Sequence, residues 1–285
     1  MASRLACPGG INPQARRVER RFLLNGPPTG YAQRMAREPS DVDDLFVPVD
    51  VELQPLPPEI RLPAPRFFPT PTATTPDGLL CVGGRLDPEW LLDAYRHGIF
   101  PWPMWEDDPI AWWSPDPRAI LELDALRISR RLQRTLRSGK FQATCDRDFD
   151  GVIRGCATAG DREENTWLMP AMIHAYCRMH ALGHAHSVEI WRADRLVGGT
   201  YGIAIGGLFA AESMFYRERD ASKVALVHLV AHLRSRGYQL LDIQQWTPHT
   251  GGLGAVEISR IEYLRRLARA IDLPVTFGQQ LEAQA

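Results

Sequence analysis

The sequence predicts an α+β fold, and three observations support that class. Residues 187–215 contain three apolar segments separated by two turn signals, which is typical of an antiparallel meander. Apolar positions spaced three and four residues apart follow between Asp220 and Gly237, which indicates a helix that packs on that sheet. The composition is that of a globular protein, since 45% of the 285 residues are hydrophobic and 24% are charged. Fibrous, wholly disordered and highly charged proteins do not fit these values.

Charge, cysteine content and hydropathy narrow the classes further. The chain has 33 Lys and Arg residues against 34 Asp and Glu, so its net charge of -1 creates no general attraction to nucleic acid or membranes. A polyanionic partner must therefore bind a local basic patch. The five cysteines form no C-x-x-C pair, which favours a reducing, cytoplasmic compartment. No apolar run approaches the roughly 20 residues needed to span a bilayer, so no membrane partner is expected.

Residues 1–66 differ from the rest of the chain. They hold 11 of the 23 prolines, and their apolar positions recur at no steady period. Such a segment buries too little apolar surface to offset the entropy lost on ordering it. We therefore expect a disordered extension over 1–66, a small domain over 67–117, a larger domain over 118–273 and a tail over 274–285.

The small domain is expected to contain one helix and a rigid aromatic segment. Asp87-Pro88 and Gly98 bracket the helix as N-cap, first-turn proline and C-terminal glycine. Four tryptophans and five prolines then alternate between residues 101 and 117. Because proline interrupts helices and restricts the residue before it, this stretch predicts extended loops.

A basic helix is predicted between Ser129 and Gly139. Six basic residues and no acidic one lie between Arg127 and Lys140, and the arginines recur on one face while leucine and isoleucine occupy another. Most charged helix faces are simply solvated. A face without acidic residues on a chain of net charge -1 is nevertheless suited to a phosphate backbone. The pattern alone leaves both interpretations open.

The larger domain is expected to contain the meander after its first helices. Its strands are expected at 187–191, 196–205 and 208–215. Ala193-Asp194 and Gly206-Gly207 are typical of the tight turns that join such strands. The helix after Asp220 leads into a further strand over 239–246, and Ser259 opens the last helix as a capping box.

Polar residues on two of these strands form a candidate reaction centre. Glu212 lies among small and apolar neighbours, where an unpaired carboxylate is costly. Asp242 and Gln244 are two residues apart, so both side chains point to one face of the strand while Leu241 and Ile243 point to the other. Each polar residue alone fits a structural role. Together, Glu, Asp and Gln on two strands predict a shared polar wall.

A second cluster has the spacing of metal ligands. Cys177, His180 and His184 follow a C-x-x-H-x-x-x-H pattern, and His186 lies two residues further on. Gly183 is expected to end the helix that carries the first two residues, so the later histidines do not share its face. We therefore predict no metal site.

Eight ordered segments resemble one known family. They are Phe-Phe-Pro at 67–69, Gly-Leu-Leu-Cys-Val-Gly-Gly-Arg-Leu at 78–86, Ala-Tyr-Arg-His-Gly-Ile-Phe-Pro-Trp at 94–102, Trp-Trp-Ser-Pro-Asp-Pro-Arg at 112–118, Leu-Gly-His-Ala-His-Ser-Val-Glu at 182–189, Glu-Ser-Met-Phe at 212–215, Ala-Ser-Lys at 221–223 and Leu-Gly-Ala-Val-Glu-Ile at 253–258. From about Phe67 to Leu267 the chain resembles the leucyl/phenylalanyl-tRNA-protein transferases.

The resemblance implies an aminoacyltransferase of the N-end rule pathway of protein degradation. Such an enzyme moves Leu or Phe, and Met less readily, from aminoacyl-tRNA to proteins that begin with Arg or Lys. It also implies a small N-terminal domain followed by a larger domain similar to GNAT acetyltransferases. No cofactor is implied, because the aminoacyl-tRNA end takes the place of coenzyme A. We expect a monomer.

The resemblance also assigns roles to residues. Asp242 and Gln244 match a pair that aligns the attacking amine and assists its deprotonation, with Glu212 beside them. The aminoacyl pocket corresponds to Phe209, Met214, Leu226, Leu233 and Leu241, with Thr200 where an apolar residue is common. The tRNA 3′ end corresponds to Trp102 and Trp167, and the tRNA phosphates to Arg130, Arg134 and Arg137. Because glutamine is a poor base, we expect Gln244 to orient the amine, with Asp242 as electrostatic support or as a partner for the incoming cation.

Two other functions compete with this one. A GNAT-type N-acetyltransferase would share the broad fold, but residues 217–223 lack the glycine-containing loop on which such enzymes usually hold the coenzyme A pyrophosphate. A non-catalytic RNA-binding module would need the basic helix and not the carboxylates. Incubation with Leu-tRNA and a peptide that starts with Arg distinguishes the three functions, because only the transferase would attach leucine to the peptide.

Overall fold

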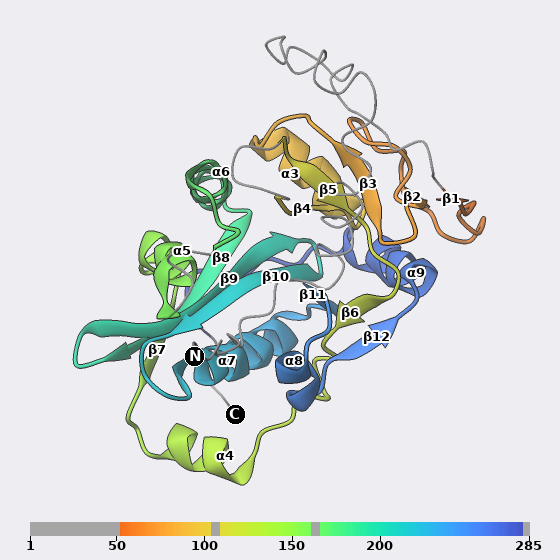
Figure 1. The fold of residues 1–285 in the computed structure, drawn as a ribbon. Helices are drawn as coiled ribbons and strands as arrows, with labels where there is room; N and C mark the ends of the chain where they lie inside the picture. The colour runs from red at the N-terminus through yellow and green to blue at the C-terminus, as the bar shows by residue number, and fades with distance from the viewer. Residues whose placement is uncertain (1–51, 104–108, 161–165, 282–285) are drawn as a thin grey trace, which may run out of the picture.

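The computed structural model describes residues 52–103, 109–160 and 166–281. A seven-stranded sheet forms its larger part, with the strand order β12-β6-β11-β10-β9-β8-β7 (Figure 1). The strands are β6 (Arg118–Ile120), β7 (Gln142–Cys145), β8 (Ala185–Arg192), β9 (Arg195–Ile205), β10 (Leu208–Tyr216), β11 (Leu240–Gln244) and β12 (Val256–Ile258). Every neighbouring pair is antiparallel except β10 and β11, which are parallel.

The predicted meander is present as β8, β9 and β10. Ala193 and Asp194 link the first two strands with φ of 46° and 61°, the left-handed conformation that a two-residue hairpin turn requires. Gly206 has a φ of 53° in the second turn. The α+β class predicted from these turns is therefore confirmed.

Helices cover both faces of this sheet. The helices α5 (Phe149–Thr158) and α6 (Pro170–Ala181) lie on one face, and α7 (Ala221–Arg236) lies on the other (Figure 1). The two faces are close-packed at β9, because a Cβ on Gly198 would come within 2.6 Å of Ala221 and one on Gly199 within 2.9 Å of Val152. The first contact is to α7 and the second to α5. Glycine at both positions lets the helices approach the strand.

The basic segment forms α4 (Arg130–Arg137), as predicted. The Ser129 side chain accepts a hydrogen bond from the Leu132 backbone N–H, so the expected N-cap is confirmed. Leu132 is buried, and Leu136 packs against the same apolar cluster as α7. The helix therefore rests on α7 through its apolar face.

A second, three-stranded sheet has the order β3-β5-β4. Its strands are β3 (Leu79–Val82), β4 (Phe100–Pro101) and β5 (Ala111–Trp113), and α3 (Pro88–Arg96) lies beside them. Asp87 caps α3 by accepting from the Trp90 backbone N–H, as predicted. The tryptophan- and proline-rich stretch, expected to form extended loops, contains β5 and the last residue of β4, and Pro101 itself lies opposite Trp112.

Part of the predicted extension is folded. The strand β1 (Glu52–Leu53) pairs with β2 (Ala73–Thr74), and Ile60 is buried. The Pro63 carbonyl accepts a hydrogen bond from His97 Nε2 at 2.9 Å. These contacts are made with segments further along the chain, so the local composition did not indicate them. Residues 1–51 lie outside the described part of the chain.

Two helices complete the C-terminal part. α8 (Pro248–Gly252) precedes β12, and α9 (Arg260–Ala270) follows it. Ser259 caps α9 by accepting from the Glu262 backbone N–H. Among the residues that the structure describes, no helix is both long and apolar enough to cross a membrane.

Candidate active site

Two irregular strands bring the predicted polar residues together. The parallel pairing of β10 and β11 ends where Ala210 lies opposite Asp242. Beyond that point the two strands no longer pair with each other: β10 stays paired with β9, and β11 stays paired with β6. The register of β10 shifts around Glu212, and that of β11 shifts between Asp242 and Gln244. Such bulges re-aim side chains. Gln244 consequently has a φ of 58°, in the left-handed region.

Glu212 is the centre of a hydrogen-bond network. Gln244 Nε2 donates to its Oε1 at 2.8 Å, and the Tyr176 hydroxyl donates to its Oε2 at 3.0 Å. The Tyr95 hydroxyl lies 2.8 Å from that of Tyr176. Both oxygens of the carboxylate therefore have a partner, and the residue is half-buried.

The environment of Glu212 raises its pKa to about 7. Burial is the largest cause, because it disfavours the charged carboxylate, and the negative Asp242 adds to it. Hydrogen bonds from Tyr95 and Tyr176 and the positive Arg118 oppose the shift but do not cancel it. Glu212 can therefore take up or release a proton near neutral pH.

Asp242 is fully buried, and both oxygens of its carboxylate accept hydrogen bonds. Arg118 Nε and Nη2 donate to its two oxygens at 2.9 and 2.6 Å, and the Tyr263 hydroxyl donates at 2.8 Å. A fourth bond, at 2.9 Å, comes from the backbone N–H of Gln244. Two roles were expected for Asp242. This geometry suits electrostatic support and leaves no position for an incoming cation. The bond from the Gln244 backbone N–H also holds Gln244 in its left-handed conformation.

Three residues of the site were not predicted from the sequence: Arg118, Tyr176 and Tyr263. Arg118 is buried between the rings of Phe100 and Tyr263, and its Nη1 donates to the Gly98 carbonyl at 2.9 Å. Burial alone would lower its pKa, but the Asp242 carboxylate raises it instead. Arg118 is the last residue of the family-like segment at 112–118, yet the sequence contains no signal that connects it to a carboxylate 124 residues away.

The predicted aminoacyl pocket residues gather on the α7 face of the sheet. Phe209, Leu226, Leu233 and Leu241 belong to one buried cluster, with Met214 partly buried against it. Thr200 lies opposite Met214 in the β9–β10 ladder. Its hydroxyl donates to the Ser213 carbonyl at 3.0 Å, so it is satisfied by backbone and does not need a polar ligand.

Trp102 and Trp167 are stacked on one another. Their ring centroids are 4.6 Å apart and their planes differ by 18°. Both residues are half-buried, and the Trp102 carbonyl accepts from Trp113 Nε1 at 3.1 Å. The structure thus brings the two predicted residues together, and in this arrangement a base has only the outer faces of the pair available.

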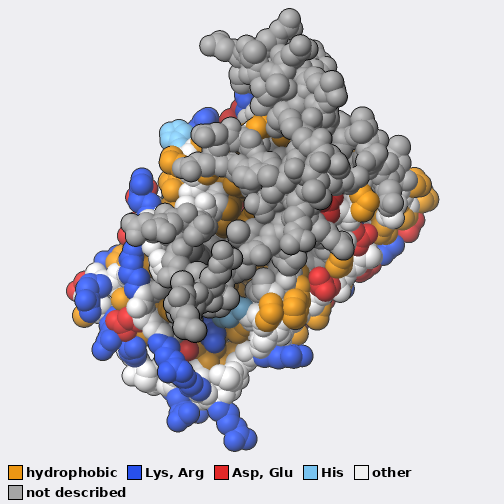
Figure 2. All heavy atoms as spheres, in the orientation of Figure 1, with side chains coloured by type: hydrophobic (Ala, Val, Ile, Leu, Met, Phe, Trp, Pro, Cys, Tyr) orange, Lys and Arg blue, Asp and Glu red, His pale blue; other side chains and the backbone are white. Residues whose placement is uncertain are grey.

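The basic helix α4 presents its arginines to solvent. Arg130, Arg134 and Arg137 are exposed and form no ion pair with the part of the chain that the structure describes. Figure 2 shows Lys and Arg side chains gathered at the end of the molecule that carries α4. Because α4 and the apolar pocket residues both pack on α7, they lie on the same side of the sheet.

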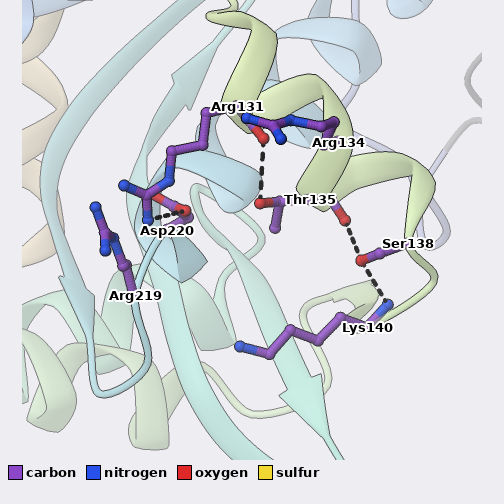
Figure 3. Close-up of a pocket in the computed structure, with 7 residues that line it drawn as sticks. All are labelled: Arg131, Arg134, Thr135, Ser138, Lys140, Arg219 and Asp220. Atoms are coloured by element: carbon purple, nitrogen blue, oxygen red, sulfur yellow. Dashed lines mark hydrogen bonds and ion pairs between the residues drawn. The ribbon is translucent and has the colours of Figure 1, made fainter.

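A hollow of about 440 Å³ adjoins α4 (Figure 3). It is lined by Arg131, Arg134, Thr135, Ser138, Lys140, Arg219 and Asp220. Four of these side chains are positive and one is negative, and the single carboxylate lies 3.3 Å from Arg131 Nη2. Arg219, which precedes α7, was not predicted. The hollow is suited to an anion such as a phosphate.

The residues with metal-ligand spacing have other contacts. His180 Nδ1 lies 2.8 Å from the Ala185 carbonyl, and its ring stacks on Phe149. His186 Nδ1 lies 2.7 Å from Asp146 Oδ2. Within the described ranges, no group of three or more His, Cys, Asp or Glu side chains is arranged to hold a metal ion.

Comparisons with known proteins identify the family. Residues 84–116 match the model of the leucyl/phenylalanyl-tRNA protein transferase N-terminal domain, and residues 120–268 match that of leucyl/phenylalanyl-tRNA protein transferase. A protein of that name from Anaeromyxobacter sp. is 50% identical over 220 residues, which is 77% of this chain and 93% of that protein. Another from Solidesulfovibrio magneticus is 55% identical over 205 residues, or 71% and 82%.

Solved structures are more distant. A GCN5-related N-acetyltransferase-like protein from Streptococcus suis has 14% identity and a TM-score of 0.33, covering 88% of this chain and 97% of that chain. The structure of L-PGS from Bacillus licheniformis has 13% identity and a TM-score of 0.34, covering 58% and 55%. The two family models and the sequence identity of the relatives show that this chain belongs to the leucyl/phenylalanyl-tRNA protein transferase family.

Proposed function

We propose that this protein transfers a leucyl or phenylalanyl group from aminoacyl-tRNA to the α-amine of proteins that begin with Arg or Lys, marking them for N-end rule degradation. The observation that carries the proposal is Glu212, with a pKa of about 7, hydrogen-bonded to Gln244 where β10 and β11 separate. An apolar cluster and an exposed basic helix lie on the α7 face of the same sheet. Family membership supports the same reaction.

The chemical step needs a proton acceptor close to the amine. The nitrogen attacks the ester carbonyl carbon, a C–N bond forms, and the C–O bond to the tRNA ribose breaks. A free α-amine has a pKa of roughly 7.7 to 8.0, so part of it is neutral near pH 7 and attacks in that form. The nitrogen becomes positively charged as the C–N bond forms and then passes one proton to the Glu212 carboxylate. Glu212 then returns the proton to the leaving ribose oxygen. Atoms and charges balance without a cofactor.

The neighbouring residues position the reactants. Gln244 orients the amine through its side-chain amide, which already points at Glu212. Asp242 acts through Gln244 by bonding its backbone N–H, and Arg118 fixes Asp242. The ester is an activated acyl donor, so orientation supplies much of the acceleration. Asp242 and Arg118 are positioning residues in this scheme, whereas Glu212 and Gln244 contact the reacting groups.

The apolar cluster selects the amino acid by shape. The cluster that receives a side chain unbranched at Cβ contains Phe209, Met214, Leu226, Leu233 and Leu241. Transfer of a Leu or Phe side chain into such a site is favoured by burial. Thr200 contributes no free hydroxyl, because its donor is bonded to backbone.

The basic surface binds tRNA phosphates. We expect the double variant Arg130→Ala, Arg134→Ala to weaken tRNA binding and to reduce the slope of log K against log salt, because fewer counterions are released. Arg154→Ala removes an exposed arginine from α5, where it pairs with Asp150, and should leave both quantities unchanged. Filter binding between 50 and 300 mM salt measures the slope. An equal slope in the double variant and the wild type would count against α4.

The stacked tryptophans bind the 3′-terminal adenosine. Trp167→Ala is expected to raise KM for aminoacyl-tRNA by roughly 5- to 160-fold, since one base-aromatic stack contributes ~1 to 3 kcal/mol. KM for the acceptor peptide should not change. Steady-state kinetics with each substrate varied in turn test this. A change confined to the peptide KM would remove the tryptophan pair from the tRNA site.

The proposal also covers the domain bounds, the cellular location and the oligomeric state. The three-stranded sheet uses residues 79–113 and the seven-stranded sheet begins at Arg118, which supports domains over 67–117 and 118–273. The cysteines in the described part of the chain form no disulfide bond, which fits a cytoplasmic location. A monomer is expected, and light scattering of the purified protein measures its mass in solution.

One assay tests the reaction directly. The protein is incubated with tRNA charged with labelled Leu and a peptide that starts with Arg, and the same peptide acetylated at its amino terminus is the control. Label should enter only the free-amine peptide. Acetyl transfer from acetyl-CoA without leucyl transfer would replace this function by an N-acetyltransferase.

A further inference from the structure

The segment after α9 is fastened to the C-terminal half of α7. Arg236 donates from Nε to the Thr276 carbonyl at 3.0 Å and from Nη2 to its hydroxyl at 2.9 Å. The buried His232 donates from Nε2 to the Phe277 carbonyl at 2.7 Å. Three hydrogen bonds therefore fix two consecutive residues of the tail. The family model ends at residue 268, so the match gives this segment no role.

These bonds insert the Phe277 ring into the apolar cluster that contains the pocket residues. Only 2% of Phe277 is exposed. Its ring stacks on His186 with centroids 4.3 Å apart, meets the His232 ring at 4.5 Å, and lies 5.7 Å from the ring of Phe209. His186 is itself held by Asp146 at 2.7 Å. The Phe277 ring therefore packs against a histidine ring that is itself held in place.

Phe209 is confined between this ring and the sheet. A Cβ on Gly202 would come within 2.5 Å of the Phe209 ring, so the ring already lies against the β9 backbone. Tyr238 meets it edge-on with centroids 6.4 Å apart. Phe277 is a further ring in contact with Phe209. The Phe209 ring is therefore packed against the β9 backbone, Tyr238 and Phe277.

We propose that Phe277 is a positioning residue that fixes Phe209 and thereby limits how deep an aminoacyl side chain can enter the pocket. The inference rests on the proposed function, because that function makes Phe209 a pocket wall. Removing the Phe277 ring leaves an unfilled volume next to Phe209. Phe209 can then move back, and the site accepts a bulkier ring than that of Phe. Size discrimination in an apolar pocket falls in the range of about 10- to 200-fold per methylene, so the change is measurable.

Binding of non-hydrolysable aminoacyl-adenosine amides tests the inference without relying on catalysis. The probes carry leucine, phenylalanine or 2-naphthylalanine, and calorimetry gives Kd for wild type, Phe277→Leu and Phe277→Ala. Val275→Ala is the matched control, since Val275 packs against the same cluster but makes no ring contact with Phe209. Thermal unfolding establishes that each variant is folded, and Phe277→Leu retains most of the buried volume if Phe277→Ala does not fold.

The expected result is a preference for naphthylalanine over leucine that rises at least 10-fold in Phe277→Ala and by a smaller factor in Phe277→Leu. The Val275→Ala ratio should equal that of the wild type. Unchanged ratios in the folded Phe277 variants, or failure of the wild type to bind any probe, overturn the inference. If the probes bind with the expected ratios but the wild type transfers no leucine, the proposed function fails and the role of Phe277 stands.

Discussion

Glu212→Gln is expected to lower the rate of leucyl transfer by about 10²- to 10⁴-fold, the usual contribution of a general base. Glutamine keeps the size of the side chain and the acceptor for Gln244 Nε2, and it can still pair with the Tyr176 hydroxyl. It cannot take the proton of the amine. The measurement is kcat with saturating Leu-tRNA and peptide. Wild-type kcat in this variant would remove Glu212 from the chemical step.

The pH dependence of kcat in the wild type and in Glu212→Gln tests the same role of Glu212. Wild-type kcat should fall as the pH drops through about 7, because Glu212 becomes protonated. The residual activity of Glu212→Gln should lack that step.

The same substitution is expected to stabilise the fold in alkaline solution. The carboxyl pKa is raised in the folded protein, from 4.5 to about 7, so the folded state favours the protonated form. The contribution to stability is therefore present below pH 4.5 and is lost as the pH rises through 7. The difference corresponds to about 3 kcal/mol. Glu212→Gln should thus unfold at higher denaturant concentration than wild type at pH 8, and at a similar concentration at pH 4.

Glu189 supplies a control for both effects. It is a fully buried carboxylate in β8 that accepts bonds from Ser187 and Thr144, and its pKa is also raised, chiefly by burial. Glu189→Gln should change stability with pH in the same direction while leaving kcat unchanged. Loss of transfer in both variants would mean that the effect of Glu212→Gln is structural.

Arg118→Met is expected to destabilise the protein by about 3 to 5 kcal/mol, because it leaves the Asp242 carboxylate buried without its positive partner. Chemical denaturation at pH 7 measures the loss. The transfer rate of the folded fraction should also fall, since Asp242 no longer holds the Gln244 backbone in one conformation. Arg154→Met, which breaks an exposed ion pair on α5, should leave the denaturation midpoint unchanged.

A double-mutant cycle separates the ion pair from the rest of Arg118. Arg118→Met combined with Asp242→Asn should cost less than the sum of the single variants, because neither partner is then left as an isolated buried charge. A double variant whose cost equals the sum would show that the two groups are not coupled. Transfer should remain low even where stability recovers.

The local conformations in this protein follow from neighbouring residues. The Ala193-Asp194 turn, the Asp87 and Ser129 caps and the apolar face of α4 were each predicted, and the structure places each where the sequence indicated. Turn and cap preferences depend on residues a few positions apart, so one sequence contains the information. The predicted face of β11 is also confirmed, since Leu241 and Ile243 pack with α7 while Asp242 and Gln244 bond on the other side.

The partners of the reactive groups could not be found in this way. The periodicity of a strand says that Asp242 and Gln244 share one face, but it does not say that Arg118, 124 residues before Asp242, neutralises that carboxylate. It likewise does not connect Glu212 with Tyr176, or Phe277 with Phe209. The pKa of Glu212 and the conformation of Gln244 depend on those distant partners. Residue patterns therefore decided the class of fold and the family of this chain, whereas the proton affinity and the shape of its site arise only when segments far apart in the sequence pack together.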